Sequence, residues 1–367
     1  WYGGAGAVFW MWASALVAMA LKYAEVVLAV SHRRTDEQGN HRGGAMYYIF
    51  DCFRGTRCAG LGKLLAAAFA ALCVLDGLSM GCVIQTNAIG GVFEGICGIP
   101  PLLTGALLCI ATLIIMLGGS ARIMKATDFL VPVMTGGFAL LSLAVLVLRA
   151  PLIPSALRSI FTAVFDLRAL LGGAGGFAVA RALRYGAMRG LVSNEAGCGT
   201  APIAHACANT DHPAKQGFWG IFEVFADTLV LCSMTALVVL LGVGVENIPF
   251  GTDAGAALTV QAFRSVFGGA LPGVIVAVCT ALFAVASVLT WGLYGSRCCE
   301  YLLGGTAAKV YRLVFALCAV AGAVMKMEDV WAIADTLNGL MALPNLVALL
   351  ALSPVVRRLS REYFFRK

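Results

Sequence analysis

The sequence predicts an all-α polytopic membrane protein. Hydrophobic residues make up 60% of its 367 residues and charged residues only 12%, and its mean hydropathy is +0.88. Soluble domains average roughly 45–50% apolar and about 25% charged residues. Runs of about 20 apolar residues, the length that crosses a bilayer as a helix, recur along the whole chain. We therefore expect one transmembrane domain over residues 1–367.

Nine apolar runs have this length, and each predicts one spanning helix. They cover residues 5–30, 64–90, 101–118, 128–149, 173–207, 217–244, 269–295, 308–325 and 329–355. Loops on the cytoplasmic side of a membrane carry an excess of Lys and Arg. If the first residue lies outside, the inner loops and tail hold seventeen of these residues and the outer loops five. This bias supports both the nine spans and the orientation.

Three of the segments outside the predicted spans have an expected location. The loop at 31–63 is expected on the cytoplasmic side, with an interfacial helix where residues 42–50 mix aromatic and charged side chains. Residues 152–170 predict a second interfacial helix on the outer side, and 355–367 a basic cytoplasmic tail. No P-loop glycine pattern and no Ser–His–Asp or Cys–His arrangement is visible. We expect neither an enzyme nor a nucleic-acid partner.

One stretch inside the membrane is unlike a lipid-embedded helix. The sequence GAMRGLVSNEAGCGTAP (186–202) carries Arg189, Asn194 and Glu195 among four glycines and ends in Pro202. Unsatisfied polar groups in hydrocarbon cost several kcal/mol, so irregular backbone at this depth occurs where it is buried in protein or lines a cavity. Transporters use such breaks to face backbone groups and half-helix dipoles toward an ion or a small charged substrate. A cytoplasmic or re-entrant loop is the alternative interpretation.

Polar residues in the second span form another candidate cluster, because intramembrane polar groups are costly without a partner or a cavity. Gln85 and Asn87 are two residues apart and therefore point to different faces of a helix. One of them is expected to face the cavity and the other to bond a neighbouring helix. Asp76, about two and a half turns before Gln85, is interpreted as a partner for an arginine.

Two further sets of charged residues lie in the fifth and sixth spans. Arg181 and Arg184 share one helical face. Their expected partners are Asp227, Glu223 or Asp128. Substrate binding by the two arginines is the alternative. Glu223 and Asp227 are four residues apart, and we expect them to serve an internal ion pair or a gate.

The span at 269–295 carries hydroxyl groups and one tryptophan. Thr280 and Ser287 share a face, and Ser287 and Trp291 are one turn apart. A hydroxyl that faces the broken segment is a suitable hard oxygen ligand for Na⁺ beside backbone carbonyls. The alternative role for Ser287 is helix packing and a bond to its own backbone.

Several blocks resemble the alanine or glycine:cation symporter family. The block SNEAGCGTAPIAHA (193–206) is similar to the family's signature at its broken helix. RGGAMYYI (42–49), TWGLYGSRCCEYLLG (290–304) and ADTLNGLMALPNLVALL (334–350) are similar to other family blocks. The resemblance extends from the first residue to about Pro354.

The resemblance implies the leucine-transporter-type fold, in which two inverted five-helix repeats each begin with a broken helix. The first broken helix would precede Trp1, so we expect an N-terminally truncated core with helices two to ten. The resemblance also implies Na⁺-coupled symport of a small neutral amino acid, alanine or glycine, by alternating access. We expect a monomer in the lipid bilayer of a prokaryotic plasma membrane. A non-transporting fragment or membrane sensor is the alternative.

The resemblance also assigns roles to residues. The substrate-binding candidates are Gln85, Asn87, Ser193, Asn194, Gly197, Gly199, Thr200 and Trp291. Ser287 and Thr290 are the candidate ligands of Na⁺, the coupling ion, and no other cofactor is expected. Arg184, Arg189, Glu195 and Asp227 are the structural or gating candidates. Ala286 stands where the family has the first of two adjacent hydroxyl residues.

Overall fold

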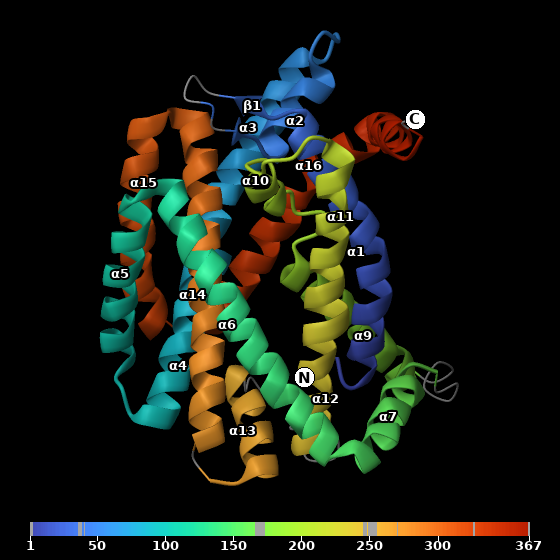
Figure 1. Ribbon diagram of the computed structural model, residues 1–367, viewed down its shortest axis with the longest axis vertical. Coiled ribbons are helices and arrows are strands. Elements are labelled where there is room, and N and C mark those ends of the chain that lie inside the picture. The colour runs from blue at the N-terminus through green and yellow to red at the C-terminus, as the bar shows by residue number, and fades with distance from the viewer. Residues whose placement is uncertain are drawn as a thin grey trace.

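The computed structural model shows a nearly all-helical bundle (Figure 1). It describes residues 3–35, 39, 41–165, 173–244, 248, 255–269, 271–325 and 327–365. Its α-helices are α1 (Gly6–Ser31), α2 (Ala45–Phe53), α3 (Ala59–Asp76), α4 (Gln85–Cys97), α5 (Pro101–Leu117), α6 (Gly119–Leu148), α7 (Ile153–Phe165), α9 (Gly173–Asn194), α10 (Ala201–His205), α11 (Pro213–Val224), α12 (Ser233–Gly242), α13 (Gly255–Phe267), α14 (Leu271–Leu303), α15 (Gly305–Val324) and α16 (Met327–Phe364). A 3₁₀ turn, η2 (Ala150–Leu152), precedes α7, and two short strands, β1 (Arg34–Thr35) and β2 (His41–Arg42), pair antiparallel before α2.

Seven helices in the described part of the chain are long and apolar enough to cross a membrane. They are Gly6–Ser31, Ala59–Cys97, Ala121–Leu148, Pro213–Gly242, Leu271–Leu303, Gly305–Val324 and Val330–Phe364. The protein is therefore a polytopic membrane protein, as predicted. The other two predicted spans fall on α5, which is apolar but only 17 residues long, and on α9, which is not among the seven.

The two ends of the bundle carry different segments (Figure 1). The helix α2, the short α10 and the C-terminal part of α16 lie at one end, and α7 and α13 lie at the other. This separation agrees with the predicted sides of the 42–50 and 152–170 segments. Residues 166–170 of the second segment, and 366 and 367 of the tail, lie outside the described residues. The predicted tail is otherwise the helical end of α16.

Two membrane-spanning helices change from α to π geometry near their middles. The π segment η1 (Gly77–Ile84) joins α3 to α4, and η3 (Phe225–Cys232) joins α11 to α12. A π segment is rare and occurs mostly at functional sites, because it breaks the regular i→i−4 ladder and redirects side chains. Thr228 of η3 bonds Asn194 at the edge of the gap between α9 and α10, as described below.

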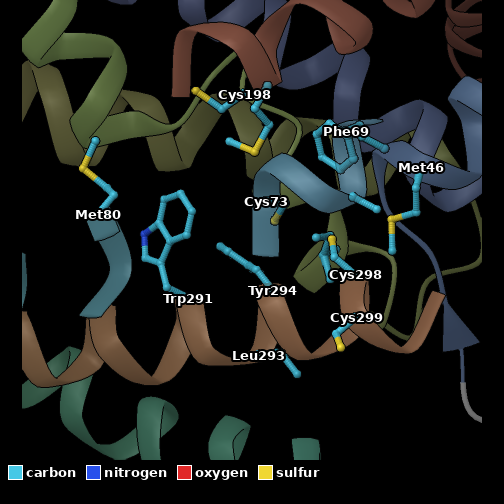
Figure 2. Close-up of a cluster of buried hydrophobic side chains, with 14 of the residues drawn as sticks. Met46, Phe69, Cys73, Met80, Cys198, Trp291, Leu293, Tyr294, Cys298 and Cys299 are labelled. Carbon is cyan, nitrogen blue, oxygen red and sulfur yellow. The ribbon is translucent and has the colours of Figure 1, made fainter. Parts of the chain in front are cut away.

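Glycines allow α14 to approach η1 closely. A Cβ on Gly81 would lie 2.3 Å from the Cβ of Trp291, so only glycine leaves room for that side chain. Figure 2 shows Trp291 and Tyr294 projecting from one side of α14, toward the side occupied by Met80 and Cys73. Both aromatic residues belong to the largest buried cluster, which also contains Cys198 from the gap between α9 and α10. The core of the bundle therefore reaches the backbone of that gap.

Candidate functional site

The helix predicted at 173–207 is broken at residues 195–200, between α9 and α10. Three alternate residues in this break have left-handed backbone: Glu195 with φ +54°, Gly197 with φ +83° and Gly199 with φ +79°. Glycine adopts this conformation without the Cβ penalty of other residues, whereas Glu195 does not. The predicted break is confirmed, and its glycines are the physical reason that the helix ends here.

Side chains at the edges of the break hold its shape. Asn194 donates to the Thr228 hydroxyl at 3.0 Å and accepts the amide of Ala196 at 3.1 Å. Thr200 donates to the Glu195 carboxylate at 2.7 Å. Both Asn194 and Thr200 are buried, so these bonds satisfy groups that would otherwise be costly. The break is therefore a defined structure and not a loose connection.

Ser193 links the break to η3. Its hydroxyl donates to the Asp227 carboxylate at 2.7 Å, and the same carboxylate oxygen accepts from Thr228 at 2.9 Å. Asp227 and Thr228 both lie in η3. The π segment thus presents two neighbouring side chains to α9, which explains why the geometry changes at this point of the span.

Two charged residues of α1 form hydrogen bonds to the backbone on the two sides of the break. Lys22 donates to the carbonyl of Asn194, the last residue of α9, at 2.6 Å. Glu25 accepts the amide of Gly199, just before α10, at 3.0 Å. Both side chains are fully buried, and their spacing of three residues places them on one face of α1. A cation thus meets the negative end of one half-helix and an anion the positive end of the other, the favourable arrangement for helix dipoles.

Lys22 is also the first member of a chain of ion pairs that extends toward the α10 end of the bundle. Its ammonium lies 3.4 Å from the Glu223 carboxylate, which lies 2.8 Å from the His205 imidazole. Gln216 lies 2.9 Å from the other ring nitrogen of His205. The prediction that Glu223 forms an internal ion pair is confirmed, and its partners are Lys22 and His205.

A polar cluster closes the α2 side of the break; we call it the inner latch, and it consists of Tyr48, Asn345 and Glu25. Asn345 donates to Glu25 at 2.5 Å and to the Gly197 carbonyl at 2.8 Å, and Tyr48 donates to the Asn345 side-chain oxygen. All three residues are 0% exposed. They come from α2, α16 and α1, so one hydrogen-bonded cluster joins three helices to the break.

A second contact lies on the α9 side; we call it the outer latch, and it consists of Arg189, Asp335 and Trp331. The guanidinium of Arg189 makes two hydrogen bonds of 3.3 Å to the Asp335 carboxylate and lies 4.3 Å from the Trp331 ring centre. Planar, two-point pairing and stacking on an aromatic face are the interactions that arginine makes best. Asp335 and Asn345 are ten residues apart on α16, which is about 15 Å along a helix. One helix therefore carries a latch on each side of the break.

The sodium:alanine symporter family profile matches residues 1–367, the whole chain. The chain belongs to this family. The family is one of transporters, so this symporter homologue is not an enzyme, in agreement with the sequence prediction.

Curated relatives of the symporter come from archaea and bacteria. The chain is 41% identical to the sodium/alanine symporter AgcS of Methanococcus maripaludis over 96% of its own length and 76% of that protein. It is 35% identical to the amino-acid carrier protein AlsT of Bacillus subtilis over 98% of this chain and 74% of that protein. A probable sodium/glutamine symporter, GlnT of the same bacterium, is 33% identical over 100% and 73%.

The symporter uses its other predicted polar residues in two ways. Asn87 donates to the carbonyls of Gly322 at 2.9 Å and Met325 at 2.6 Å, so it bonds the end of α15. Gln85 makes one long contact of 3.5 Å, to the Met80 carbonyl. Asn87 is thus the member of the pair that bonds a neighbouring helix, and Gln85 keeps more of its hydrogen-bonding capacity free.

The predicted Na⁺ ligands lie on α14. Ser287 donates to the Phe283 carbonyl at 3.1 Å and Thr290 to the Ala286 carbonyl at 2.9 Å. Each hydroxyl therefore bonds the backbone of its own helix, which is the alternative expected for Ser287. The oxygen lone pairs stay available, and a role as Na⁺ ligands stays a prediction.

Two predicted arginine pairings are wrong. Arg184 is exposed and contacts the ring of Tyr185, with no ion pair to Asp227, Glu223 or Asp128. Asp76 has no arginine partner among the described residues and accepts instead from Ser79 at 3.1 Å. Helical spacing places such charges on a face, but it does not show which neighbouring helix that face meets.

Several important residues of the site had no predicted role. They are Lys22, Glu25, Tyr48, Asn345 and Asp335. A signal existed for the first two, because a lysine and a glutamate one turn apart inside an apolar span are expensive unless they bind a partner. Tyr48 and Asn345 gave no comparable signal, since tyrosine and asparagine also occur singly in spans for packing.

For the outer latch we expect coupled behaviour of Arg189 and Asp335. Arg189→Gln should lower the rate of uptake severalfold, because α9 loses two charge-assisted hydrogen bonds to α16 beside the break. Asp335→Asn should have a similar effect. The double variant should be no worse than either single variant, because both remove the same contact. Uptake kinetics on the four proteins measure this, and additive effects of the two substitutions would contradict the outer latch.

Proposed function

We propose that the protein carries out Na⁺-coupled symport of a small neutral amino acid, alanine or glycine, by alternating access. The observation that carries this proposal is the break at residues 195–200, held by buried side chains and lying between two latches. Family membership supports transport, and we propose alanine or glycine as the transported amino acid. The bacterial and archaeal relatives support a prokaryotic plasma membrane.

In this proposal the break binds both substrate and ion. Gly197 and Gly199 shape the break and act indirectly, because the Gly199 amide already bonds the Glu25 carboxylate and the Gly197 carbonyl accepts from Asn345. The side-chain oxygen of Gln85 accepts from the ammonium group, and Asn87 acts indirectly because its amide group already bonds the end of α15. Na⁺ is held between the break and the hydroxyl groups of Ser287 and Thr290. The side chains of Ser193, Asn194 and Thr200 act indirectly, because their donors are already bonded within the break or to η3.

Trp291 supports a small substrate. It is 5% exposed and packs against Gly81 in the cluster that includes Cys198 of the break. In this proposal the ring of Trp291 borders the substrate and limits its side chain to about a methyl group. We therefore place alanine and glycine ahead of glutamine, the amino acid in the name of one relative.

Alternating access requires that only one side of the break opens at a time. Arg189, Glu195 and Asp227 lie at or beside the break, and Arg189 forms the outer latch directly. Glu195 and Asp227 hold the break's two edges through Thr200 and Ser193. We propose a leucine-transporter-type arrangement for the helical core, with one copy as the transporting unit.

Uptake of labelled alanine and glycine into proteoliposomes tests the function. An inward Na⁺ gradient should drive uptake of both, and excess glutamine should compete weakly. Binding of alanine without gradient-driven uptake would instead favour a non-transporting sensor.

A further inference from the structure

Asp76 is a buried carboxylate that nothing above uses. It is the last residue of α3, directly before η1, and its side chain is 0% exposed. Oδ1 accepts from the Ser79 hydroxyl at 3.1 Å. Oδ2 is buried and has no hydrogen-bond partner in the described part of the chain. Such an oxygen loses its hydrogen bonds to water on burial and gains none from the protein.

The charged groups around Asp76 do not compensate it. The two charged side chains that act on it most strongly are Glu195 and Asp335, both acidic. Asp335 is already paired with Arg189, and Lys22 is bonded to the break and to Glu223. A buried charge without a partner costs several kcal/mol, and acidic neighbours increase that cost. The position is therefore incomplete without a positive charge that the described side chains do not supply.

The position lies beside the break. The helix α3, which ends at Asp76, packs against the break: an added Cβ on Gly199 would lie 2.7 Å from Phe69 of α3, and Cys73 belongs to the same buried cluster as Cys198. A charge bound at Asp76 would therefore act on the segment proposed to bind substrate. This proximity makes Asp76 a candidate for coupling and not only for packing.

A second oxygen without a donor comes from α16. Asn338 is 9% exposed, and its Oδ1 is buried with no hydrogen-bond partner among the described residues. It lies three residues after Asp335 and so shares that residue's face of α16. The helix α16 packs against both α3 and η1. Two packed elements thus each bury an oxygen that lacks a donor, and hard cations such as Na⁺ prefer oxygen ligands of this kind.

We propose that Asp76 forms a second Na⁺ site of the symporter, with Asn338 Oδ1 as a further ligand. This site is separate from the hydroxyl groups of Ser287 and Thr290, and it rests on the proposed function for its role in coupling. A proton on Asp76 would also neutralise the carboxylate, and the resulting hydroxyl would donate to the Asn338 oxygen. Na⁺ is the coupling ion of the proposed function, and the binding measurement below distinguishes it from a proton.

Direct binding of ²²Na⁺ to the purified protein tests the site without transport. Asp76→Asn keeps the size of the side chain and removes its charge, so we expect saturation binding to fall by one ion per protein. The matched control is Ser142→Ala, which removes another fully buried oxygen without a partner, in α6. It should bind as the wild type does. Unchanged stoichiometry and affinity in Asp76→Asn would overturn the proposal.

Thermal unfolding in detergent gives a second readout. Na⁺ that binds only the folded state raises its Tm. We expect a smaller Na⁺-dependent rise for Asp76→Asn than for wild type, together with a Tm in Na⁺-free buffer no lower than that of wild type, because a buried charge is gone. If Asp76→Asn instead abolishes a pH dependence of uptake and leaves Na⁺ binding intact, the carboxylate carries a proton and the Na⁺ site is wrong. Wild-type protein that binds Na⁺ but takes up no amino acid would contradict the proposed function alone.

Discussion

Lys22→Met should abolish most transport and destabilise the protein. The substitution leaves the Asn194 carbonyl and the Glu223 carboxylate without their buried partner. Removing one member of a buried ion pair costs roughly 3–5 kcal/mol, and we expect about 3 because the Glu223 side chain is 43% exposed. The Tm in detergent and Na⁺-driven uptake measure the two effects, and uptake should fall at least tenfold.

Lys215→Met is the matched control for Lys22. Lys215 also pairs with a carboxylate, that of Asp211 at 3.1 Å, but the two side chains are 57% and 76% exposed. Exposed pairs contribute about 0–1 kcal/mol, so this variant should behave as wild type. A second check is Lys22→Met in a Glu223→Gln background, where the loss should be smaller because no charge is left unpaired. Equal behaviour of Lys22→Met and Lys215→Met would contradict the role of Lys22 at the break.

Gly199→Ala should have an effect of similar size for a different reason. Gly199 has φ +79°, and an added Cβ would lie 2.7 Å from Phe69 Cε2 and 2.8 Å from Ala45 Cβ. Left-handed backbone costs a non-glycine residue roughly 1–2 kcal/mol, and overpacking adds roughly 1–3 kcal/mol. We expect a total loss of about 3 kcal/mol and uptake reduced at least tenfold.

Gly98→Ala separates the two causes. Gly98 also has left-handed backbone, with φ +66°, but no atom lies within 4 Å of its added Cβ. It should lose only the backbone part, about 1–2 kcal/mol, and keep transport. Measurements of Tm and of uptake for both variants distinguish backbone strain from close packing of the break. If Gly98→Ala impairs uptake as strongly as Gly199→Ala, close packing of the break is not the cause.

The sequence predicted the helical membrane class and the broken helix well, because both depend on local properties. Apolar runs of spanning length and glycines around Glu195 act through nearby residues only. The partners of Asp76 and Arg184 were predicted wrongly, since they depend on which helices pack together. Asn345 illustrates this limit, because its bonds to Glu25 and Gly197 join residues 320 and 148 positions away. No periodicity within one segment contains that information.

The assignment of helical faces from a regular 3.6-residue period also failed inside the second predicted span. The interval from Asp76 to Gln85 was treated as regular α-helix, but η1 occupies it. A π turn takes more residues than an α turn, so the faces assigned to Gln85 and Asn87 relative to Asp76 do not follow from a period of 3.6. The roles of Gln85, Ser287 and Trp291 in binding stay predictions.

The π segments also bear on how homologous sequences can be compared. A π turn takes one residue more than an α turn, so a homologue with one residue fewer between Asp76 and Gln85 could form a regular α-helix there and keep its later side chains on their present faces. An alignment gap placed outside η1 would instead assign the residues in between to faces that differ by about 100°. The same holds for η3 and the residues of α12 that follow it. For these two spans, a residue-by-residue comparison depends on placing any gap inside the π segment.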